Sequence, residues 1–254
     1  MYVSKVLPEK LNNKRIDSIL VELDLVSSRQ KAISMIMAGN VFVNESKIVK
    51  PGKTVKRDSL IKIRKKGHEW VSRGGVKLSG AIKKFKVDVR NKICLDIGCS
   101  TGGFSDVLLE SGAKIIYAVD VGYGQFDWGL RNSKKIILLE KTNARHLNFS
   151  LIPTNLDLVV CDVSFISLKK VIQPIKQLLK SKFEIVALIK PQFEVNKKLV
   201  GRGGIIKDTL IHQKVCESIR SWFEYEFKTD FIQLMTSPIE GQKGNKEFFI
   251  YVKK

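Results

Sequence analysis

Hydrophobic and polar residues alternate in two different periods along the first 66 residues of the chain. Apolar positions follow helical spacing in residues 15–23 and 29–39, which predicts two amphipathic helices. They then alternate with polar positions in NVFVNES and SLIKIRKK, which predicts two strands. The apolar face of the second helix is expected to consist of Ala32, Ile33, Ile36 and Met37.

Local signals mark the ends of the second helix and the two sides of the second strand. Ser27 and Ser28 are suitable N-cap residues, and Gly39 stands where a C-cap glycine belongs. Three basic residues are expected on one side of the strand, namely Lys62, Arg64 and Lys66.

From residue 73 onward the pattern changes to a regular alternation of strands and helices. Strands are predicted over 93–97, 115–120, 136–139, 156–161, 185–189, 231–235 and 248–252. Helices are predicted over 76–86, 103–111, 168–180 and 208–226. Such alternation predicts a doubly wound α/β sheet, with the last two strands pairing as an antiparallel hairpin. The expected division is a first domain over 1–66, a linker over 67–72 and a second domain over 73–254.

Composition narrows the class of protein. The chain has 254 residues and is 44% hydrophobic, which suffices for one α/β core and a small accessory domain. No apolar run approaches the ~20 residues that span a bilayer, and MYVSKVLPEKLNNKR has no secretory apolar core, so a cytoplasmic protein is expected. Four cysteines without a CxxC pair make a metal site improbable; they are Cys94, Cys99, Cys161 and Cys216.

The net charge of +20 favours a polyanionic partner such as nucleic acid, or an anionic membrane surface. Charge density is highest at the start of the chain, where residues 1–66 hold 15 Lys and Arg but only 6 Asp and Glu.

The strongest local motif is the glycine-rich turn CLDIGCSTGGF, which connects a predicted strand to a predicted helix. Its spacing differs from the G-x-G-x-x-G of dinucleotide sites, and Asp96 would repel a pyrophosphate, which argues against a nicotinamide oxidoreductase. A carboxylate there would instead attract a cationic ligand. About twenty residues on, Asp120 ends the next strand, where an acid can accept hydrogen bonds from ribose hydroxyls.

An acid in the first glycine turn and an acid on the second strand together resemble the site of class I S-adenosylmethionine (SAM) enzymes. A nucleobase edge could be held after the third strand, near Asn143, Ala144 and Arg145. The candidate SAM-binding residues are Asp96, Gly98, Ser100, Thr101, Gly102, Gly103, Phe104, Asp120, Val121, Asn143, Ala144, Arg145 and Asp162.

Four charged residues form the candidate catalytic set. Asp162 and Lys190 each follow a predicted strand, so both should lie at the carboxyl edge of the sheet, where ligands bind in open α/β folds. Lys77 and Glu247 stand in the glycine-rich settings WVSRGGVKL and GNKEFFI. In this order they match the Lys-Asp-Lys-Glu tetrad of FtsJ-like 2'-O-ribose methyltransferases.

Two longer resemblances support this match. SSRQKAISMIMAGNVFVNESKIVKPGKTV resembles an S4-type RNA-binding domain, and WVSRGGVKL, LDIGCSTGGF, AVDVGYGQFDWGLR, CDVSFISL, LIKPQFE and SPIEGQKGNKEFF follow the order of the TlyA (haemolysin A-like) family. The main departure is Cys99, where that family commonly has serine. The resemblance implies a class I SAM-dependent methyltransferase (Rossmann-like) domain behind a small α+β S4-like domain. It further implies 2'-O-methylation of cytidines in 23S and possibly 16S rRNA within ribosomal subunits.

The chemistry of the four residues fits this reaction. A ribose hydroxyl becomes a good nucleophile as its proton is removed, and a lysine can remove it if burial and a neighbouring positive charge lower its pKa. Asp162 and Glu247 would hold the ammonium groups, while the choice between Lys190 and Lys77 as the base stays open. RNA contacts are expected from Arg29, Lys31, Lys62, Arg64, Lys65, Lys66 and Arg73.

Two other classes compete with this interpretation. A membrane-active cytolysin, suggested by the haemolysin name, is opposed by the missing export signal and spanning segment. A non-catalytic RNA-binding assembly factor would predict a broken tetrad or a broken glycine turn, and the sequence retains both.

Overall fold

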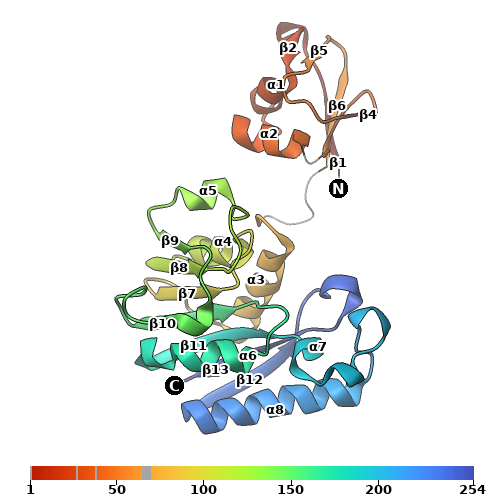
Figure 1. Cartoon of the computed structure of the whole chain (residues 1–254). Helices are drawn as coiled ribbons and strands as arrows, with labels where there is room; N and C mark the ends of the chain where they lie inside the picture. Colours follow the sequence, from red (N-terminus) through yellow and green to blue (C-terminus); the bar gives the residue numbers. More distant parts are fainter. Residues whose placement is uncertain (1, 27, 38, 65–69) are drawn as a thin grey trace. The chain divides into compact units, whose positions relative to one another are not determined.

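The computed structural model describes residues 2–26, 28–37, 39–64 and 70–254. The chain forms two compact units, residues 1–69 and 70–254, and each is described by itself (Figure 1).

The first unit is a small two-layer α+β structure. Two helices, α1 (Ile16–Glu22) and α2 (Arg29–Met37), pack on one face of a four-stranded sheet of order β1-β6-β3-β4. The strands of this sheet are β1 (Tyr2–Val6), β3 (Val41–Val43), β4 (Ser46–Ile48) and β6 (Leu60–Arg64), and all pair antiparallel. A short ladder joins β2 (Lys14–Arg15) to β5 (Thr54–Val55), and a 3-10 turn covers Glu9–Leu11.

The predicted helices and strands of this unit are confirmed, with two corrections. Met37 is 69% exposed, so it does not belong to the buried face that Ala32 and Ile36 form. Strand β1 was not predicted, because four of its five side chains are exposed and leave little apolar signal, and the short strands β2, β4 and β5 were not predicted either. Gly39 has a φ of 68°, as a C-cap glycine should, whereas Ser27 lies outside the described residues.

The second unit is built on a seven-stranded sheet of order β12-β13-β11-β10-β7-β8-β9 (Figure 1). Its strands are β7 (Ile93–Ile97), β8 (Ile115–Val119), β9 (Ile136–Leu139), β10 (Leu156–Cys161), β11 (Leu179–Ile189), β12 (Phe231–Thr236) and β13 (Phe248–Lys253). Only β13 runs against the others, and it pairs antiparallel with both β11 and β12. The predicted doubly wound sheet with a final antiparallel hairpin is therefore confirmed.

Helices cover both faces of this sheet and enclose one apolar core on each side. One core contains α3 (Arg73–Phe85), α4 (Gly103–Glu110) and α5 (Trp128–Arg131), and the other contains α6 (Leu168–Ile172) and α8 (Thr209–Phe227). The remaining elements are α7 (Pro191–Glu194) and the 3-10 turns Ala144–His146, Gln173–Leu178, Lys197–Leu199, Arg202–Gly204 and Gln242–Gly244.

The helix predicted over 168–180 is partly wrong. Its α-helical part ends at Ile172, and a 3-10 segment continues over Gln173–Leu178 with Pro174 in its first turn. Proline lacks the backbone N–H that an α-helix needs there and its ring crowds the preceding turn, which explains the change of helix type. Strand β11 then begins at Leu179, six residues before the predicted start.

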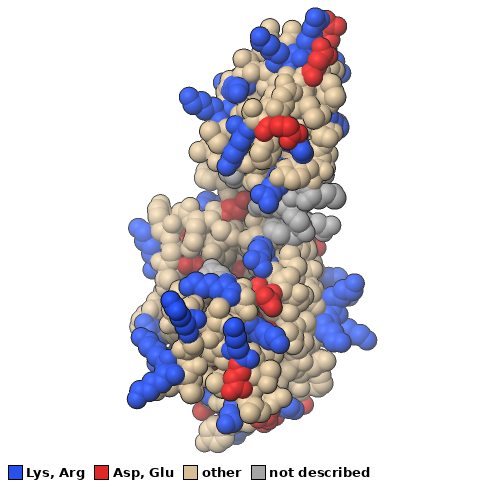
Figure 2. Space-filling model, turned by 90° about the vertical axis from the view of Figure 1, so that its right-hand side faces the viewer, with Lys and Arg blue, Asp and Glu red and all other residues tan. Residues whose placement is uncertain are grey.

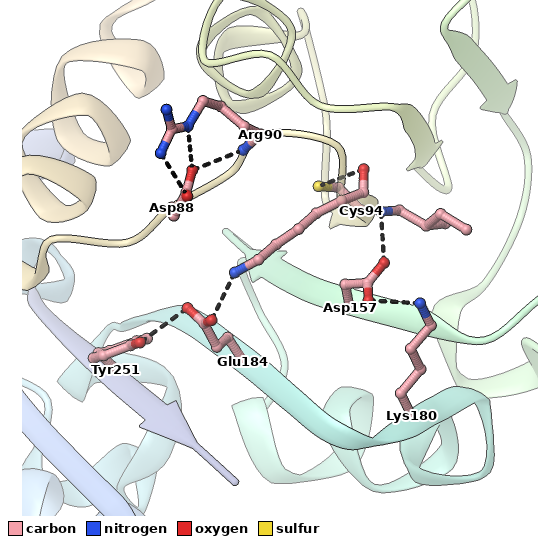
Figure 3. A network of polar contacts seen from close by, with 9 residues as sticks. Asp88, Arg90, Cys94, Asp157, Lys180, Glu184 and Tyr251 are labelled. Carbon is pink, nitrogen blue, oxygen red and sulfur yellow. Dashed lines mark hydrogen bonds and ion pairs between the residues drawn. The ribbon is translucent and has the colours of Figure 1, made fainter.

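A closed network of polar contacts holds the edge of the sheet where β10 and β11 begin (Figure 3). Lys92 forms a 2.6 Å ion pair with Glu184, whose other oxygen accepts a 2.9 Å hydrogen bond from Tyr251. Lys180 pairs with Asp157 at 2.7 Å, and Asp157 also accepts from the backbone N–H of Ile93. Each of these two carboxylates therefore has a donor on both oxygens.

Candidate active site

The glycine-rich turn leads from β7 into α4 through a backbone that only small residues can adopt. Gly98 has a φ of 80°, and a Cβ there would lie 2.5 Å from the carbonyl oxygen of Asp162. Gly102 has a φ of 94°, and a Cβ there would meet Leu130 at 2.7 Å and Phe126 at 3.0 Å. Both glycines are thus required by conformation and by contact, which leaves the turn backbone open to a ligand.

Gly103 begins α4, and a side chain at this position is excluded by contacts with the start of α3. A Cβ at this position would lie 2.2 Å from the Ser72 hydroxyl and 2.9 Å from the Gly75 amide, so Gly103 permits close packing of α4 against α3. The next residue, Phe104, is 3% exposed and stacks on Phe249. Its side chain therefore belongs to the core, and only its backbone is available to the turn.

Asp96, at the end of β7, is fully buried. Its Oδ2 accepts a 2.6 Å hydrogen bond from the Ser105 hydroxyl, while its Oδ1 is buried without a partner. Burial raises the pKa of Asp96 to about 7, the Ser105 hydrogen bond opposes this shift, and the negative charge of Asp162 adds to it. A buried acceptor without a donor is costly, and a cationic ligand donating to Oδ1 would remove that cost.

Asp120, which follows β8, is fixed by the turn beside it. Its Oδ2 accepts from the Ser100 amide at 2.8 Å, and its Oδ1 accepts from the Gly122 amide at 2.7 Å. Ser100 itself has a φ of 48°, a strained value for serine. Oδ1 also accepts a 3.4 Å hydrogen bond from the Gln125 side chain, so the lone pair that remains for a ribose hydroxyl is on Oδ2.

The remaining candidate SAM-binding residues have varied surroundings. Thr101 and Val121 are exposed, the latter to 72%. Asn143 accepts from the backbone and side chain of Arg145, so it fixes the turn after β9, and Ala144 is buried within that turn. Cys99 is buried with its amide bonded to Val119, and burial raises the pKa of its thiol.

The four charged residues of the candidate catalytic set form two ion pairs. Lys190 Nζ lies 2.6 Å from Asp162 Oδ1 and donates to the Ser164 hydroxyl at 2.9 Å. Lys77 Nζ lies 2.6 Å from Glu247 Oε2, and these two side chains are only 12% and 3% exposed. Ser164 was not predicted, because a serine in a loop gives no periodic signal.

The strand order brings the two pairs to the same edge of the sheet. Asp162, Lys190 and Glu247 adjoin β10, β11 and β13, which are neighbours in that order. The antiparallel register of β11 and β13 pairs Ile189 with Phe248, so Lys190 and Glu247 occupy the next opposed positions. Pro191 opens α7 directly after Lys190, and strand β11 ends at Ile189.

The predicted RNA-contact residues are only partly described. In the first unit, Arg29 and Arg15 both pair with the buried carboxylate of Asp17, at 3.1 and 2.9 Å. Sequence reasoning missed Arg15 and Asp17, because a buried carboxylate shared by two arginines is visible only in the fold. In the second unit, Arg73 donates to the carbonyl oxygen of Glu240.

The other predicted RNA contacts lie on or near strand β6. Lys62 and Arg64 project from the same side of β6, and Lys62 pairs with Glu45 at 3.2 Å. Lys65 and Lys66 lie outside the described residues, and so does the side chain of Lys31 in α2.

The second unit also contains a cavity that none of the four paired residues lines. A cavity of about 500 Å³ lies beside α8, and the residues that line it include Ser167, Glu194 and Lys214 but none of the four paired residues. Among the described residues, no group of three or more His, Cys, Asp and Glu is placed to hold a metal ion. No helix in the described ranges has the length and apolar character to cross a membrane.

The sheet order, the single antiparallel strand and the acids at the ends of β7 and β8 define a class I methyltransferase fold. Residues 70–254 match the model of the FtsJ-like methyltransferases, and residues 14–61 match that of the S4 domain. The chain belongs to the FtsJ-like methyltransferase family, with an S4 domain in front.

Similar proteins extend over nearly the whole chain. A 16S/23S rRNA (cytidine-2'-O)-methyltransferase, TlyA of Mycobacterium tuberculosis, is 40% identical over 94% of this chain and 89% of its own. A protein named Hemolysin A from Brachyspira hyodysenteriae is 39% identical, over 93% of this chain and 98% of its own. A solved structure from Streptococcus thermophilus, described as a candidate hemolysin, has a TM-score of 0.69 at 35% identity and covers 96% of this chain and 89% of its own.

Proposed function

We propose that this methyltransferase transfers a methyl group from SAM to the ribose 2'-hydroxyl of cytidines in rRNA, within ribosomal subunits. The observation that carries the proposal is the pairing of Lys190 with Asp162 and of Lys77 with Glu247 at the sheet edge that also carries the glycine turn. The name of the TlyA relative supports the cytidine and the rRNA. An enzyme with this substrate would act in the cytoplasm, where ribosomal subunits occur.

The residues around the turn fit SAM. The unpartnered Oδ1 of Asp96 suits the ammonium group of the cofactor, and the remaining lone pair on Asp120 Oδ2 suits a hydroxyl of its ribose. The glycine turn lets the backbone approach the ligand closely, and the segment 143–145 would lie near the base. When bound, SAM supplies an electrophilic methyl group on a positively charged sulfur.

Lys190 is proposed as the group that takes the proton from the 2'-hydroxyl. For this step the Lys190 ammonium of the ion pair would first release a proton to solvent. The amine would then accept the 2'-hydroxyl proton, and Asp162 and the Ser164 hydroxyl would hold the ammonium that forms again. Lys77 would orient the 2'-oxygen, and the buried Glu247 carboxylate keeps that lysine in place. The reverse assignment, with Lys77 as the base, uses the same geometry and is decided by the kinetics of the two alanine variants.

The surroundings of the pair also suit a nucleotide substrate. Phe165, directly after Ser164, is 89% exposed with a φ of 65°, and its ring contacts Phe193 at a centroid distance of 5.0 Å. An exposed aromatic ring held in a strained backbone beside the catalytic pair can stack on an unpaired base. Both units present more basic than acidic side chains on the face shown in Figure 2, which supports an RNA partner.

Incubation of the enzyme and isotopically labelled SAM with each isolated ribosomal subunit tests this proposal. We expect label in the RNA of at least one subunit, and we expect the Asp162→Asn variant to transfer far less. Lys182→Ala is the matched control, because Lys182 is an exposed residue at the opposite end of β11. Absence of label from both subunits would contradict the proposal.

A further inference from the structure

The outer face of the four-stranded sheet in the first unit carries aromatic and basic side chains. Residues on this face alternate with the core residues Ile61 and Ile63, which point toward α1 and α2. The register of β1, β6, β3 and β4 places the following side chains on the outer face: Tyr2, Ser4, Val6, Leu60, Lys62, Arg64, Phe42 and Lys47.

Two aromatic rings meet over the strand between them. Tyr2 on β1 stands opposite Arg64 of β6, and Phe42 on β3 stands opposite Lys62 of the same strand. The rings of Tyr2 and Phe42 reach across β6 to a centroid distance of 6.0 Å, at an interplanar angle of 67°. Tyr2 remains 49% exposed, so the pair presents an aromatic surface to the outside of the sheet.

Three basic residues neighbour this aromatic pair in the register of the sheet, and the end of the Lys47 side chain lies against Gly39. Lys62 Nζ lies 5.0 Å from the centre of the Tyr2 ring, Lys47 stands opposite Phe42 on β4, and Arg64 stands opposite Tyr2. Glu45 pairs with Lys62, so it does not balance the positive charges of Lys47 and Arg64. Positive charge around exposed rings attracts a phosphate chain and offers its bases a stacking surface.

We propose that this outer face, which we call the Tyr2–Phe42 platform, binds single-stranded RNA by stacking bases on the two rings while Lys47, Lys62 and Arg64 contact the phosphates. Four-stranded sheets with exposed aromatic residues bind single strands in this way, whereas helical RNA offers no free base faces. The platform deepens the proposed function, since it gives the first unit a binding surface for unpaired nucleotides of the substrate RNA.

Two observations separate this platform from the S4 domain in general. The S4 match begins at residue 14, so β1 and Tyr2 lie before the matched residues. The platform is also on the opposite side of the sheet from α2 and Arg29. A cross-strand aromatic pair can stabilise a sheet without binding a ligand. Stabilisation alone does not require that the tyrosine is half exposed or that basic residues lie beside the rings.

Binding of the full chain to a labelled single-stranded pyrimidine oligoribonucleotide tests the platform, with a duplex of the same sequence for comparison. We expect Tyr2→Ala and Phe42→Ala each to weaken single-strand binding by about 5- to 100-fold, and duplex binding to change by less than about twofold. Tyr2→Phe and Phe42→Tyr should bind single strands as the wild type does, because both substitutions keep an aromatic ring. Lys62→Gln should reduce the slope of affinity against salt by about one phosphate contact.

Tyr225→Ala is the matched control, because Tyr225 is an 80% exposed tyrosine on α8 in the second unit. Ultraviolet crosslinking of the wild-type protein to the same oligonucleotide should label the peptides that contain Tyr2 or Phe42. If the two alanine variants lower the unfolding temperature but bind single strands as the wild type does, the platform is structural and the proposal is wrong. Equal losses on single strands and duplex would contradict it as well.

The outcome is independent of the proposed enzymatic function. Phe42→Ala should keep the affinity of the protein for SAM. If the wild-type protein methylates neither subunit, the catalytic proposal is wrong. If Phe42→Ala still loses single-strand binding in that case, the platform remains supported.

Discussion

The central strands of the large sheet carry similar ion pairs at both of their ends, here called the two edges, but the surroundings of the pairs differ. At one edge Lys92 pairs with Glu184 at 2.6 Å and Lys180 with Asp157 at 2.7 Å (Figure 3). At the other, Lys190 pairs with Asp162 and Lys77 with Glu247, both at 2.6 Å. Both edges use residues in or next to β11 and β13, so neither the residue types nor the distances distinguish a candidate catalytic edge from a structural one.

The difference lies in how completely the polar atoms are satisfied. Glu184 has donors from Lys92 and Tyr251, and Asp157 has donors from Lys180 and the Ile93 amide. The carboxyl edge instead adjoins Asp96, whose buried Oδ1 has no partner. Closed networks of this kind stabilise a fold, whereas an unsatisfied buried acceptor beside an open glycine turn indicates a ligand.

The largest expected effect separates Lys190, directly after β11, from Lys180 near the start of that strand. Lys190→Ala should lower the rate of methyl transfer by about 10²–10⁴-fold, since it removes the proposed general base, while SAM binding changes little. Lys180→Ala removes a 2.7 Å ion pair at the start of β11 and should leave the rate within about twofold. Single-turnover kinetics on ribosomal subunits measures both. If both variants lost methyl transfer to the same extent, the two edges would not differ in function.

The next effect concerns the glycine turn. Gly98→Ala would place a Cβ 2.5 Å from the Asp162 carbonyl oxygen and should weaken SAM binding by about tenfold or more, because the turn must shift. Gly124→Ala is the matched control, since Gly124 has a similar φ of 74° but nothing within 4 Å of the added atom. Calorimetric titration with SAM separates crowding from backbone strain. A Gly98→Ala variant with wild-type affinity would place the ligand elsewhere.

A smaller effect follows from the pKa of Asp96, which burial raises to about 7. Only the ionised carboxylate pairs with a cation, so SAM affinity should rise by about tenfold between pH 6 and pH 8. The Asp96→Asn variant should bind more weakly and show no such dependence. Asp88→Asn is the control at the other edge, since Arg90 holds the pKa of Asp88 at about 2. A wild-type affinity that is constant across this range would contradict the role of Asp96.

The same pKa predicts a change in stability without ligand. Since the folded protein favours the protonated form of Asp96, its stabilising contribution is present below the ordinary carboxyl value near 4 and is lost as the pH rises through about 7. Asp96→Asn should therefore flatten the dependence of the unfolding temperature on pH between 4 and 7. An unchanged slope would show that Asp96 is ionised in the ligand-free protein throughout this range.

The smallest effect belongs to the structural edge. Tyr251→Phe removes the hydrogen bond to Glu184 and should lower the free energy of unfolding by about 1–2 kcal/mol, with methyl transfer unchanged. Denaturant unfolding together with the transfer assay measures both quantities. A loss of transfer in this variant, with little loss of stability, would assign the polar network of Figure 3 a catalytic role.

The sequence predicted the large sheet well because its strands are buried and their apolar runs are continuous. It also predicted that four charged residues share a site, two because they follow such strands and two from the resemblance to the Lys-Asp-Lys-Glu tetrad, and the structure places all four at one edge of the sheet. It could not predict their pairing, because which carboxylate meets which lysine depends on β13 inserting between β11 and β12. Ser164 and Ser105 escaped notice for a related reason, as single hydroxyls acquire meaning only from their neighbours.

The first unit was harder to predict in full. Strand β1 has exposed side chains on both of its faces, so its sequence lacks the apolar–polar alternation that marks a half-buried strand. The triad of Arg15, Asp17 and Arg29 joins residues up to fourteen positions apart, and only the packing of α1 on α2 brings them together. Hydrophobic periodicity finds cores, whereas polar clusters of this kind depend on tertiary contacts.

The chemical identity of the methylated nucleoside tests the central claim most directly. RNA from subunits treated with the wild-type enzyme and labelled SAM would be digested to nucleosides and separated by mass spectrometry, with Lys190→Ala in parallel. The account predicts label in 2'-O-methylcytidine with the wild-type enzyme and a loss of about 10²–10⁴-fold with the variant. Label on a nucleobase, or undiminished 2'-O-methylcytidine with Lys190→Ala, would contradict it.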